Sequence, residues 1–193
     1  MENCYRATVE LLDMKDRGYL DSKQRDENEW QRSMNTRQLQ PADMGAAAEI
    51  WNEVIRDGNA FAEEECLTPE EASTLFSTQS YVGIAQDANR EIVGAYILHP
   101  NYPGRLGGIC NASFAVRKSH RGKHIGEKLV EDCIEKAKTI GFRIIQFNAV
   151  IESNTHARHL YERLGFIQSG TIPDGFRLKD GSYENICQYY LKL

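Results

Sequence analysis

The segment that decides the fold is S-H-R-G-K-H-I-G-E-K-L, residues 119–129. It joins an apolar run typical of a strand to an amphipathic run typical of a helix. A turn of this kind leaves backbone N–H groups unpaired at the positive end of the helix dipole, where they attract anions. The segment therefore predicts an anion-binding turn between a strand and a helix.

Two known phosphate-binding fingerprints share this architecture, and neither fits the segment. It has no Gly-Lys-Ser/Thr ending to supply a hydroxyl for magnesium, and it lacks the early paired glycines of G-x-G-x-x-G. What remains is Arg121 followed by Gly126 at a strand-to-helix turn. On these residues alone, a capped helix after an exposed turn is an equally good interpretation.

Length and composition indicate one globular domain. The chain has 193 residues, of which 41% are hydrophobic and 26% charged, enough to bury a core. A net charge of -5 argues against a nucleic-acid partner and favours a cationic ligand such as an amine. No apolar run is long enough for a membrane span or a signal core, so we expect a cytoplasmic protein without a membrane partner.

Cysteine and histidine spacing predicts no metal site. The five cysteines lie apart without a C-x-x-C pair, which indicates reduced thiols rather than a disulfide framework or a zinc site. His120 with His124, and His156 with His159, have helical spacing, yet no cysteine or carboxylate stands at a matching spacing. We interpret these histidines as solvated side chains.

Patterning divides the chain into a charged extension at 1–35 and one domain at 36–193. For the extension, docked helical pieces, disorder and a role in a homodimer are all open. The strand at 143–151 is a continuous apolar run, typical of a strand buried on both faces. Periodicity predicts helices at 41–58, 69–76, 125–137 and 157–164, and strands at 81–85, 92–98, 109–116, 143–151, 166–167, 176–178 and 183–191. This order indicates a mixed α/β sheet covered by helices.

Two motifs in one order resemble the GNAT superfamily of N-acetyltransferases. V-R-K-S-H-R-G-K-H-I-G at 116–126 is similar to its acetyl-CoA pyrophosphate loop, and N-T-H-A-R-H-L-Y-E-R-L-G-F at 154–166 is similar to its second signature. The resemblance covers residues 36–193 and implies a mixed, largely antiparallel central sheet flanked by helices. It also implies a pantetheine contact from Asn154 and a pyrophosphate cradle made by Arg121 and the amides of Gly122, Lys123, His124, Ile125 and Gly126.

His124 departs from the superfamily pattern, because it stands where the first motif glycine is expected. It adds a side chain beside the phosphates. A helical backbone tolerates a side chain at this position, so we expect such a backbone and retained binding.

Finer resemblance implies amino-acid-like amines as acceptors. Residues 59–71 look like the substrate-side segment of the phosphinothricin-type acetyltransferases. Asn111, together with Asn148 on the next strand, is similar to the fungal acetyltransferases for azetidine-2-carboxylate and related proline analogues. In that group the strand asparagines contact the substrate, which implies the same role for Asn111 and Asn148.

Acetyl transfer needs a polarised carbonyl, a proton donor for the leaving thiolate and a way to remove a proton from the amine. The amides of Ala115 and Val116 are the predicted oxyanion donors. Tyr161 is the predicted acid, with packing in a helical stripe as the alternative. Arg158 is one of four basic residues, with Arg117, Lys118 and Lys123, of which one is expected to meet the CoA 3'-phosphate.

The general base stays open at the level of sequence. Alternation places Asn111 and Asn148 in one polar cluster that orients substrate or water, which favours desolvation and a water relay. The alternative is a carboxylate from the charge run at 63–65, although such runs are usually solvated faces.

These residues together predict an enzyme, an acetyl-CoA-dependent N-acetyltransferase that acts without a metal on a small amine, an amino acid or an analogue. Two alternatives stay open. A protein N-terminus or lysine would be the acceptor if the rim formed by 100–108 and 170–177 leaves an open groove. A non-catalytic acyl-CoA-binding module would keep the cradle without turnover.

Overall fold

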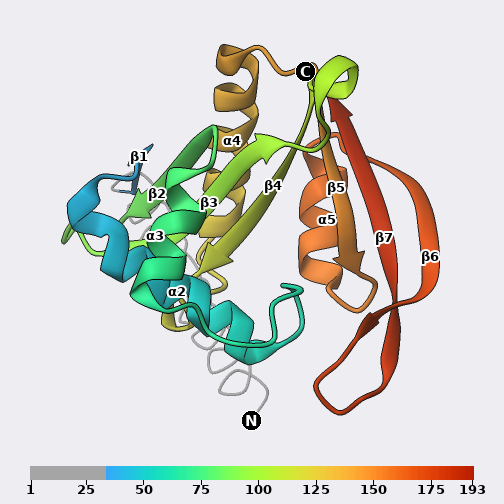
Figure 1. The fold of residues 1–193 in the computed structure, drawn as a ribbon, viewed down its shortest axis with the longest axis horizontal. Helices are drawn as coiled ribbons and strands as arrows, with labels where there is room; N and C mark the ends of the chain where they lie inside the picture. The colour runs from blue at the N-terminus through green and yellow to red at the C-terminus, as the bar shows by residue number, and fades with distance from the viewer. Residues whose placement is uncertain (1–33) are drawn as a thin grey trace, which may run out of the picture.

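The computed structural model describes residues 34–193, so the predicted extension at 1–35 lies outside it except for its last two residues. The described chain forms one seven-stranded sheet with the strand order β1-β2-β3-β4-β5-β7-β6 (Figure 1). Neighbouring strands are antiparallel except β4 and β5, which run parallel. The predicted mixed, largely antiparallel α/β sheet is confirmed.

Strands and helices succeed one another along the chain with the following bounds. The strands are β1 Asn35–Gln38, β2 Tyr81–Gln86, β3 Ile92–Pro100, β4 Ile109–Val116, β5 Ile144–Ile151, β6 Ile167–Arg177 and β7 Tyr183–Lys192. The helices are α2 Met44–Asp57, α3 Pro69–Ser77, α4 Ile125–Ile140 and α5 Thr155–Arg163, with 3-10 turns η1 Pro41–Asp43, η2 Gly104–Leu106 and η3 Lys118–His120. Within residues 34–193 no helix has the length and apolar character that a bilayer span requires.

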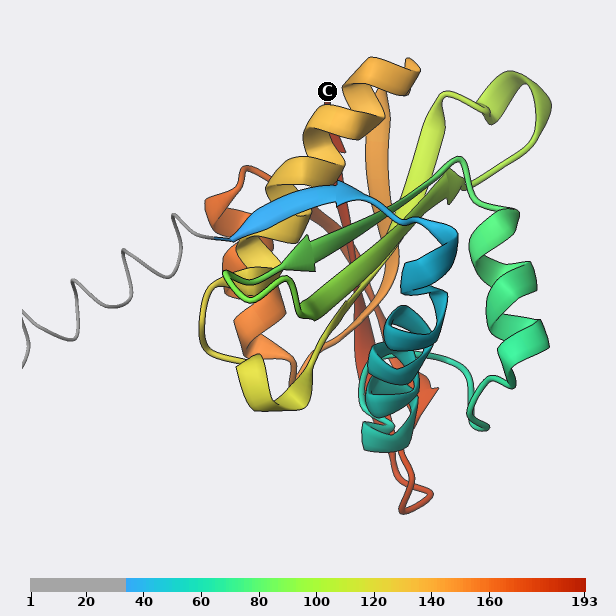
Figure 2. The ribbon, with the colours of Figure 1, turned by 90° about the vertical axis from the view of Figure 1, so that its left-hand side faces the viewer.

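Helices cover the sheet on two faces, which we call the α2–α3 face and the α4–α5 face (Figure 2). On the first face, Trp51 and Phe76 pack with Ile97 of β3 in one core. On the second face, Leu129 of α4 packs with Phe147 of β5 in another. Successive side chains of each strand alternate between the two faces, so a residue's place in the strand decides which core it enters.

β4 and β5 pair at one end only. The ladder joins Ile109 with Ile144 and Cys110 with Ile145, and beyond these residues the strands diverge (Figure 1). β4 stays on β3 as far as Val116, whereas β5 follows β7. The result is a V-shaped gap, called the V below, which is closed at Cys110 and opens toward the turn at 117–124.

The expectation that the strand at 143–151 is buried on both faces is wrong. Ile145 and Phe147 are buried in the α4–α5 core, but Gln146 and Asn148 are only partly buried. Because β5 diverges from β4, α2 packs over β3 and β4, and neither α2 nor α3 packs extensively on β5. The polar side chains on that face of β5 therefore border the V.

A charge pair ties the first strand to the start of α2. β1 was not predicted, because its four residues are all polar. Arg37 in β1 donates from Nη1 and Nη2 to the two carboxylate oxygens of Asp43, at 2.6 and 3.0 Å. Asp43 is 8% exposed. The hydrogen bond from Arg37 is the main cause that lowers the pKa of this carboxyl group.

Replacing this carboxylate tests what the pair contributes. We expect Asp43→Asn to lower the free energy of unfolding by about 1–3 kcal/mol at neutral pH, since a charged hydrogen bond is lost. Because the pKa of Asp43 is lower in the folded protein than in the unfolded chain, the ionised carboxylate stabilises the fold at pH values above the ordinary pKa of aspartate. This contribution disappears as the pH falls through the pKa of the folded state. The free energies of unfolding of the wild-type protein and of Asp43→Asn, measured in urea, should therefore converge at acidic pH. Glu131→Gln, at an exposed pair on α4, is the control and should change stability little. A difference in stability between wild type and Asp43→Asn that stays constant at all pH values would contradict the stabilising role of the ionised Asp43.

Candidate active site

The turn between β4 and α4 presents unpaired backbone amides. Side chains cap the neighbouring helices, Thr68 on α3 and Asn154 on α5, but no side chain of the described residues caps α4. The N–H of Lys128 bonds to the carbonyl of His124 at 3.3 Å. The N–H groups of Ile125 to Glu127 precede this first helical bond and point out of the helix end, as an anion site requires.

His124 has a left-handed backbone, with φ of 58°, and the helical conformation expected from sequence is wrong. This conformation costs an L-residue roughly 1–2 kcal/mol, which explains why the superfamily motif has glycine here. Histidine is among the residues that tolerate it best. The Nδ1 atom of His124 lies 3.1 Å from Oε2 of Glu127, so the ring is held beside the first turn of α4.

Arg121 is anchored to α2 by an ion pair. Its Nη1 donates to Oδ2 of Asp57 at 2.5 Å and its Nε to the carbonyl oxygen of Val116 at 3.3 Å. Lys118 donates to the other oxygen of Asp57 at 3.0 Å. Burial raises the pKa of Asp57, but the hydrogen bonds from Arg121 and Lys118 outweigh burial and the pKa is lowered. Sequence patterning missed Asp57, because it lies 64 residues before Arg121.

The register of β3 and β4 decides which amides of β4 face the V. At the two ends of this ladder, the N–H of Arg117 bonds to Val93 and the N–H of Asn101 bonds to Ile109. Both pairs continue the register of the β3–β4 ladder, and hydrogen-bonded pairs recur at every second residue of an antiparallel ladder. Odd-numbered residues of β4 therefore direct their N–H groups to β3, and even-numbered residues direct theirs away from it.

This register corrects one predicted oxyanion donor. Ala115 lies opposite Ala95, so its N–H is used in the ladder with β3. Val116 directs its N–H away from β3 and toward the V, and its role as an oxyanion donor remains a prediction. Phe114, which sequence reasoning did not name, directs its N–H the same way. The signal that could have found Phe114 is the two-residue alternation of the strand itself.

Tyr161 lies on α5 beside β5, on the α4–α5 face. Its ring packs on Phe147 and Phe166, with centroid distances of 4.5 and 5.6 Å. No group in residues 34–193 forms a hydrogen bond with its hydroxyl. Burial raises the pKa of this hydroxyl, so it keeps its proton at neutral pH. The ring thus has the predicted packing, while the hydroxyl stays available as a donor.

The two predicted CoA contacts on α5 have partners within the protein. The Oδ1 atom of Asn154 accepts the N–H of Ala157 at 3.3 Å, which caps the helix. Arg158 donates from Nε to the Tyr189 hydroxyl and from Nη1 to the carbonyl of Glu152, both at 3.1 Å. These bonds hold Arg158 against β7. The contacts of Asn154 with pantetheine and of Arg158 with the 3'-phosphate remain predictions.

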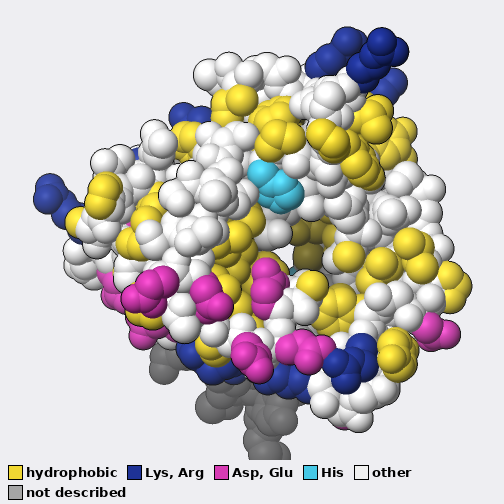
Figure 3. Space-filling view, viewed as in Figure 1, with side chains coloured by type: hydrophobic (Ala, Val, Ile, Leu, Met, Phe, Trp, Pro, Cys, Tyr) yellow, Lys and Arg dark blue, Asp and Glu magenta, His cyan; other side chains and the backbone are white. Residues whose placement is uncertain are grey.

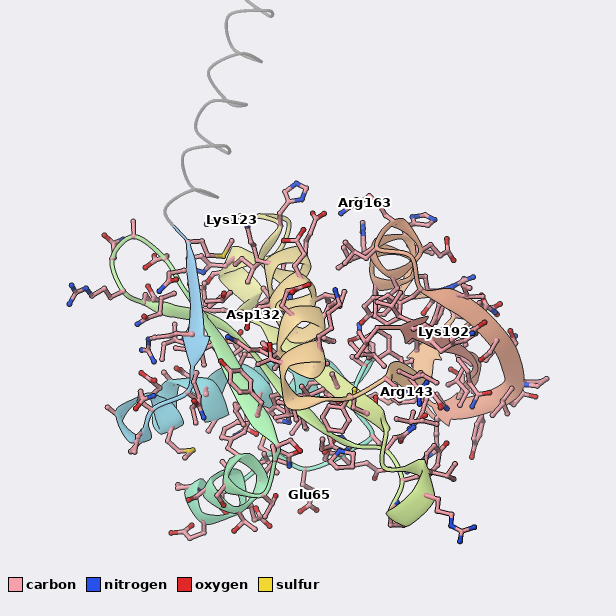
Figure 4. The ribbon with its side chains drawn as sticks, turned by 90° about the horizontal axis from the view of Figure 1, so that it is seen from above. Glu65, Lys123, Asp132, Arg143, Arg163 and Lys192 are labelled. Carbon is pink, nitrogen blue, oxygen red and sulfur yellow. The ribbon has the colours of Figure 1, made fainter. Side chains whose placement is uncertain are left out.

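Two further cations border the same end of the α4–α5 layer. Figure 4 shows Lys123 near the start of α4 and Arg163 at the end of α5. The Nη2 atom of Arg163 lies 2.7 Å from Oε1 of Glu127, which joins the two helices. The pair between Arg163 and Glu127 therefore holds the first turn of α4, which carries the unpaired amides, against α5.

A polar network occupies the α2–α3 side of the V near its closed end. Asn148 and Asn101 exchange two hydrogen bonds, at 2.8 and 3.1 Å, and Gln146 donates to Asn148 at 3.0 Å. The amide oxygen of Asn111 instead accepts the N–H of Ala112 at 2.9 Å. Asn148 is thus in a shared cluster as predicted, but no hydrogen bond within the described chain joins it to Asn111.

His99 belongs to this side of the V and was missed from the sequence. It lies directly opposite Asn111 in the β3–β4 ladder, so both side chains are on one face. That face is the α2–α3 face, because Ile97, two residues earlier, enters the α2–α3 core. The Nδ1 atom of His99 lies 3.0 Å from the carbonyl oxygen of Pro100. The alternation of side chains along the predicted strand 92–98, extended by one residue, could have placed His99 on this face.

A loop and a hairpin frame the V on the same face. Arg177 in β6 pairs with Glu64 in the loop between α2 and α3, and Lys179 in the hairpin donates to the carbonyl of Arg56. Figure 3 shows a hollow in the centre of this face, with acidic side chains gathered along one rim and a histidine at its border. Glu65 lies on this face as well (Figure 4). An acidic rim favours a cationic ligand.

Comparison with known proteins places this geometry in a family. The N-acetyltransferase aca1 of Schizosaccharomyces pombe is 43% identical over 93 residues, which are 48% of this chain and 44% of that protein. The chain thus spans less than half the length of this relative. The L-methionine sulfoximine/L-methionine sulfone acetyltransferase of Pseudomonas aeruginosa is 30% identical over 148 residues, 73% of this chain and 84% of that protein.

A solved structure and a family profile agree with these relatives. A GCN5-related N-acetyltransferase from Kribbella flavida has a TM-score of 0.79 at 34% identity, covering 84% of this chain and 99% of that one. Residues 44–166 match the profile described as the Acetyltransferase (GNAT) family, a range that includes both motifs at 116–126 and 154–166. The chain belongs to the Acetyltransferase (GNAT) family.

Proposed function

We propose that the protein transfers the acetyl group of acetyl-CoA to the amine of a small molecule, an amino acid or amino-acid analogue. The observation that carries the proposal is the V, which has unpaired amides at its open end and a polar network near its closed end. The names of the two curated relatives support it, since both are acetyltransferases and one acts on analogues of methionine.

The open end of the V fits the charged part of acetyl-CoA. The N–H groups of Ile125 to Glu127 would bind the pyrophosphate, and those of Phe114 and Val116 would face the thioester arm. Arg121 holds the turn in place through its ion pair with Asp57. Acetyl-CoA supplies the activated acetyl group, and the chain supplies its binding and orientation.

The two reaction partners would meet through the V from opposite faces. Tyr161, on the α4–α5 face, is the proposed proton donor for the departing thiolate. Asn111 and Asn148, on the α2–α3 face, would orient the acceptor. The amides that face the V would stabilise negative charge on the carbonyl oxygen without reorganising, because the strand fixes them in advance.

Two rival functions are favoured less by the geometry. A peptide acceptor needs an open groove, whereas the contacts of Arg177 with Glu64 and of Lys179 with Arg56 bridge the rim at the hairpin. A non-catalytic binding module needs no proton donor, whereas Tyr161 is present and its hydroxyl is available.

Acceptor specificity can be measured directly as CoA release. The protein is mixed with acetyl-CoA, a thiol-reactive dye and one acceptor from a panel of amino acids, cyclic imino acids, polyamines, aminoglycosides and peptides with free N-termini. We expect turnover with amino or imino acids. Turnover with peptides alone would move the function to protein modification. Acetyl-CoA binding without turnover on any acceptor would favour the binding module.

The role of the Arg121 ion pair is tested by two variants together. If Arg121 acts by holding the turn against α2, Arg121→Gln and Asp57→Asn should each weaken acetyl-CoA binding by roughly tenfold, since each removes the same charged hydrogen bond. Isothermal titration calorimetry measures this, with Lys138→Gln at the far end of α4 as the control. Weaker binding in Arg121→Gln alone would show instead that Arg121 contacts the phosphates itself.

The acid role of Tyr161 predicts a split between rate and affinity. Tyr161→Phe keeps the ring packing and removes the proton, so kcat should fall about 100-fold while the Kd of acetyl-CoA stays the same. Tyr183→Phe, at a tyrosine that is 58% exposed, is the matched control. An unchanged kcat would return Tyr161 to a packing role.

A further inference from the structure

We infer that His99 is the general base that takes the proton from the acceptor amine. This inference rests on the proposed function and names a residue of the same site. His99 lies opposite Asn111 on the α2–α3 face, whereas Tyr161 packs on Phe147 on the other face. His99 would therefore lie on the same face as the acceptor amine, and Tyr161 on the same face as the departing thiolate.

The hydrogen bond at Nδ1 prepares the ring to accept a proton. The Nδ1 atom of His99 lies 3.0 Å from the carbonyl oxygen of Pro100. A carbonyl oxygen only accepts, so the neutral ring carries its proton on Nδ1 and keeps a lone pair on Nε2. The bond to Pro100 also orients the ring, as the orienting partner of a catalytic imidazole does.

The closed end of the V places His99 near the reacting atoms. A ligand anchored at the amides of Ile125 to Glu127 enters from the open end, so its tip points toward the closure at Cys110. Asn111 is the first residue of β4 beyond that closure. Directly opposed residues of antiparallel strands have Cβ atoms about 4.5–5.5 Å apart, so His99 lies next to the place where that tip would end.

Other titratable groups on this face make poorer bases. The hydroxyl of Tyr102 lies 3.4 Å from Nε2 of Gln146, and a phenol is protonated near neutrality. Glu63, Glu64 and Glu65 come from the loop between α2 and α3 and are all exposed. Glu64 is engaged by Arg177, and exposed carboxylates in general are weak bases at neutral pH. Imidazole is the side chain best matched to proton transfer there.

The proposed step balances as follows. The lone pair of the acceptor nitrogen forms a bond to the acetyl carbonyl carbon, and that nitrogen passes one proton to Nε2 of His99. The carbon–sulfur bond breaks, and the sulfur keeps its electron pair and takes a proton from the Tyr161 hydroxyl. His99 then releases its proton to water and Tyr161 regains one from water. The products are the acetylated amine and free CoA.

The test is the pH dependence of kcat/KM for an accepted amino or imino acid. In the wild-type protein we expect kcat/KM to rise with pH, as a reaction that depends on a general base requires. His99→Gln should lower kcat/KM about 100-fold or more near neutrality and abolish that acidic limb. Added imidazole should restore part of the rate in His99→Ala. His156→Gln, at an exposed histidine of α5, is the matched control and should keep the wild-type profile.

Two outcomes separate this inference from the proposed function. If the wild-type protein turns over amino acids and His99→Gln keeps both the rate and the acidic limb, His99 is not the base and the proposed function stands. If the wild-type protein has no turnover with any acceptor, the proposed function fails and the inference fails with it. Unchanged acetyl-CoA affinity and circular dichroism in His99→Gln would show that a loss of rate is not a loss of fold.

Discussion

The divergence of β4 from β5 is the constraint on which the rest of the structure depends. A parallel pair needs a crossover connection, and α4 supplies it between these two strands. Only two residues of each strand pair before β5 turns toward β7. A bulge in β5, where Asn148 and Ala149 lie opposite a single residue of β7, bends the strand at this point. The divergence of the two strands and the bulge in β5 thus form the gap from the backbone itself.

Ion pairs fix the open end of the V to α2. Besides the bonds of Asp57 to Arg121 and Lys118, the guanidinium of Arg117 lies 3.5 Å from carboxylate oxygens of Glu49 and Glu53. The turn that would hold the phosphates is therefore fastened to α2, which covers the opposite face of the sheet. A shift of α2 would therefore move this turn as well.

Local signals predicted most of the elements, and long-range contacts account for what they missed. Capping at Thr68 and the period of the apolar residues in α4 are properties of neighbouring residues, so helices α3 and α4 could be found from sequence. The role of Asp57 depends on a partner 64 residues away, and that of Asn101 on a partner 47 residues away. Alternation groups His99 with Ile97 and Phe114 with Val116, but the register, which is fixed only once the strands are paired, decides which face and which direction each pair takes. His124 shows the limit of a motif, because it stands where the motif has glycine and it has a left-handed backbone all the same.

Backbone amide shifts, measured by NMR during a titration with acetyl-CoA, would show whether acetyl-CoA enters the V at the turn before α4. If it does, we expect the largest changes at Phe114, Val116 and the amides of 125–127. A second depression, lined by Arg105, Arg143 and Lys192, lies beyond the closed end of the V (Figure 4). Shifts around those basic residues, with the amides of the V unchanged, would show that acetyl-CoA binds in this depression and not in the V.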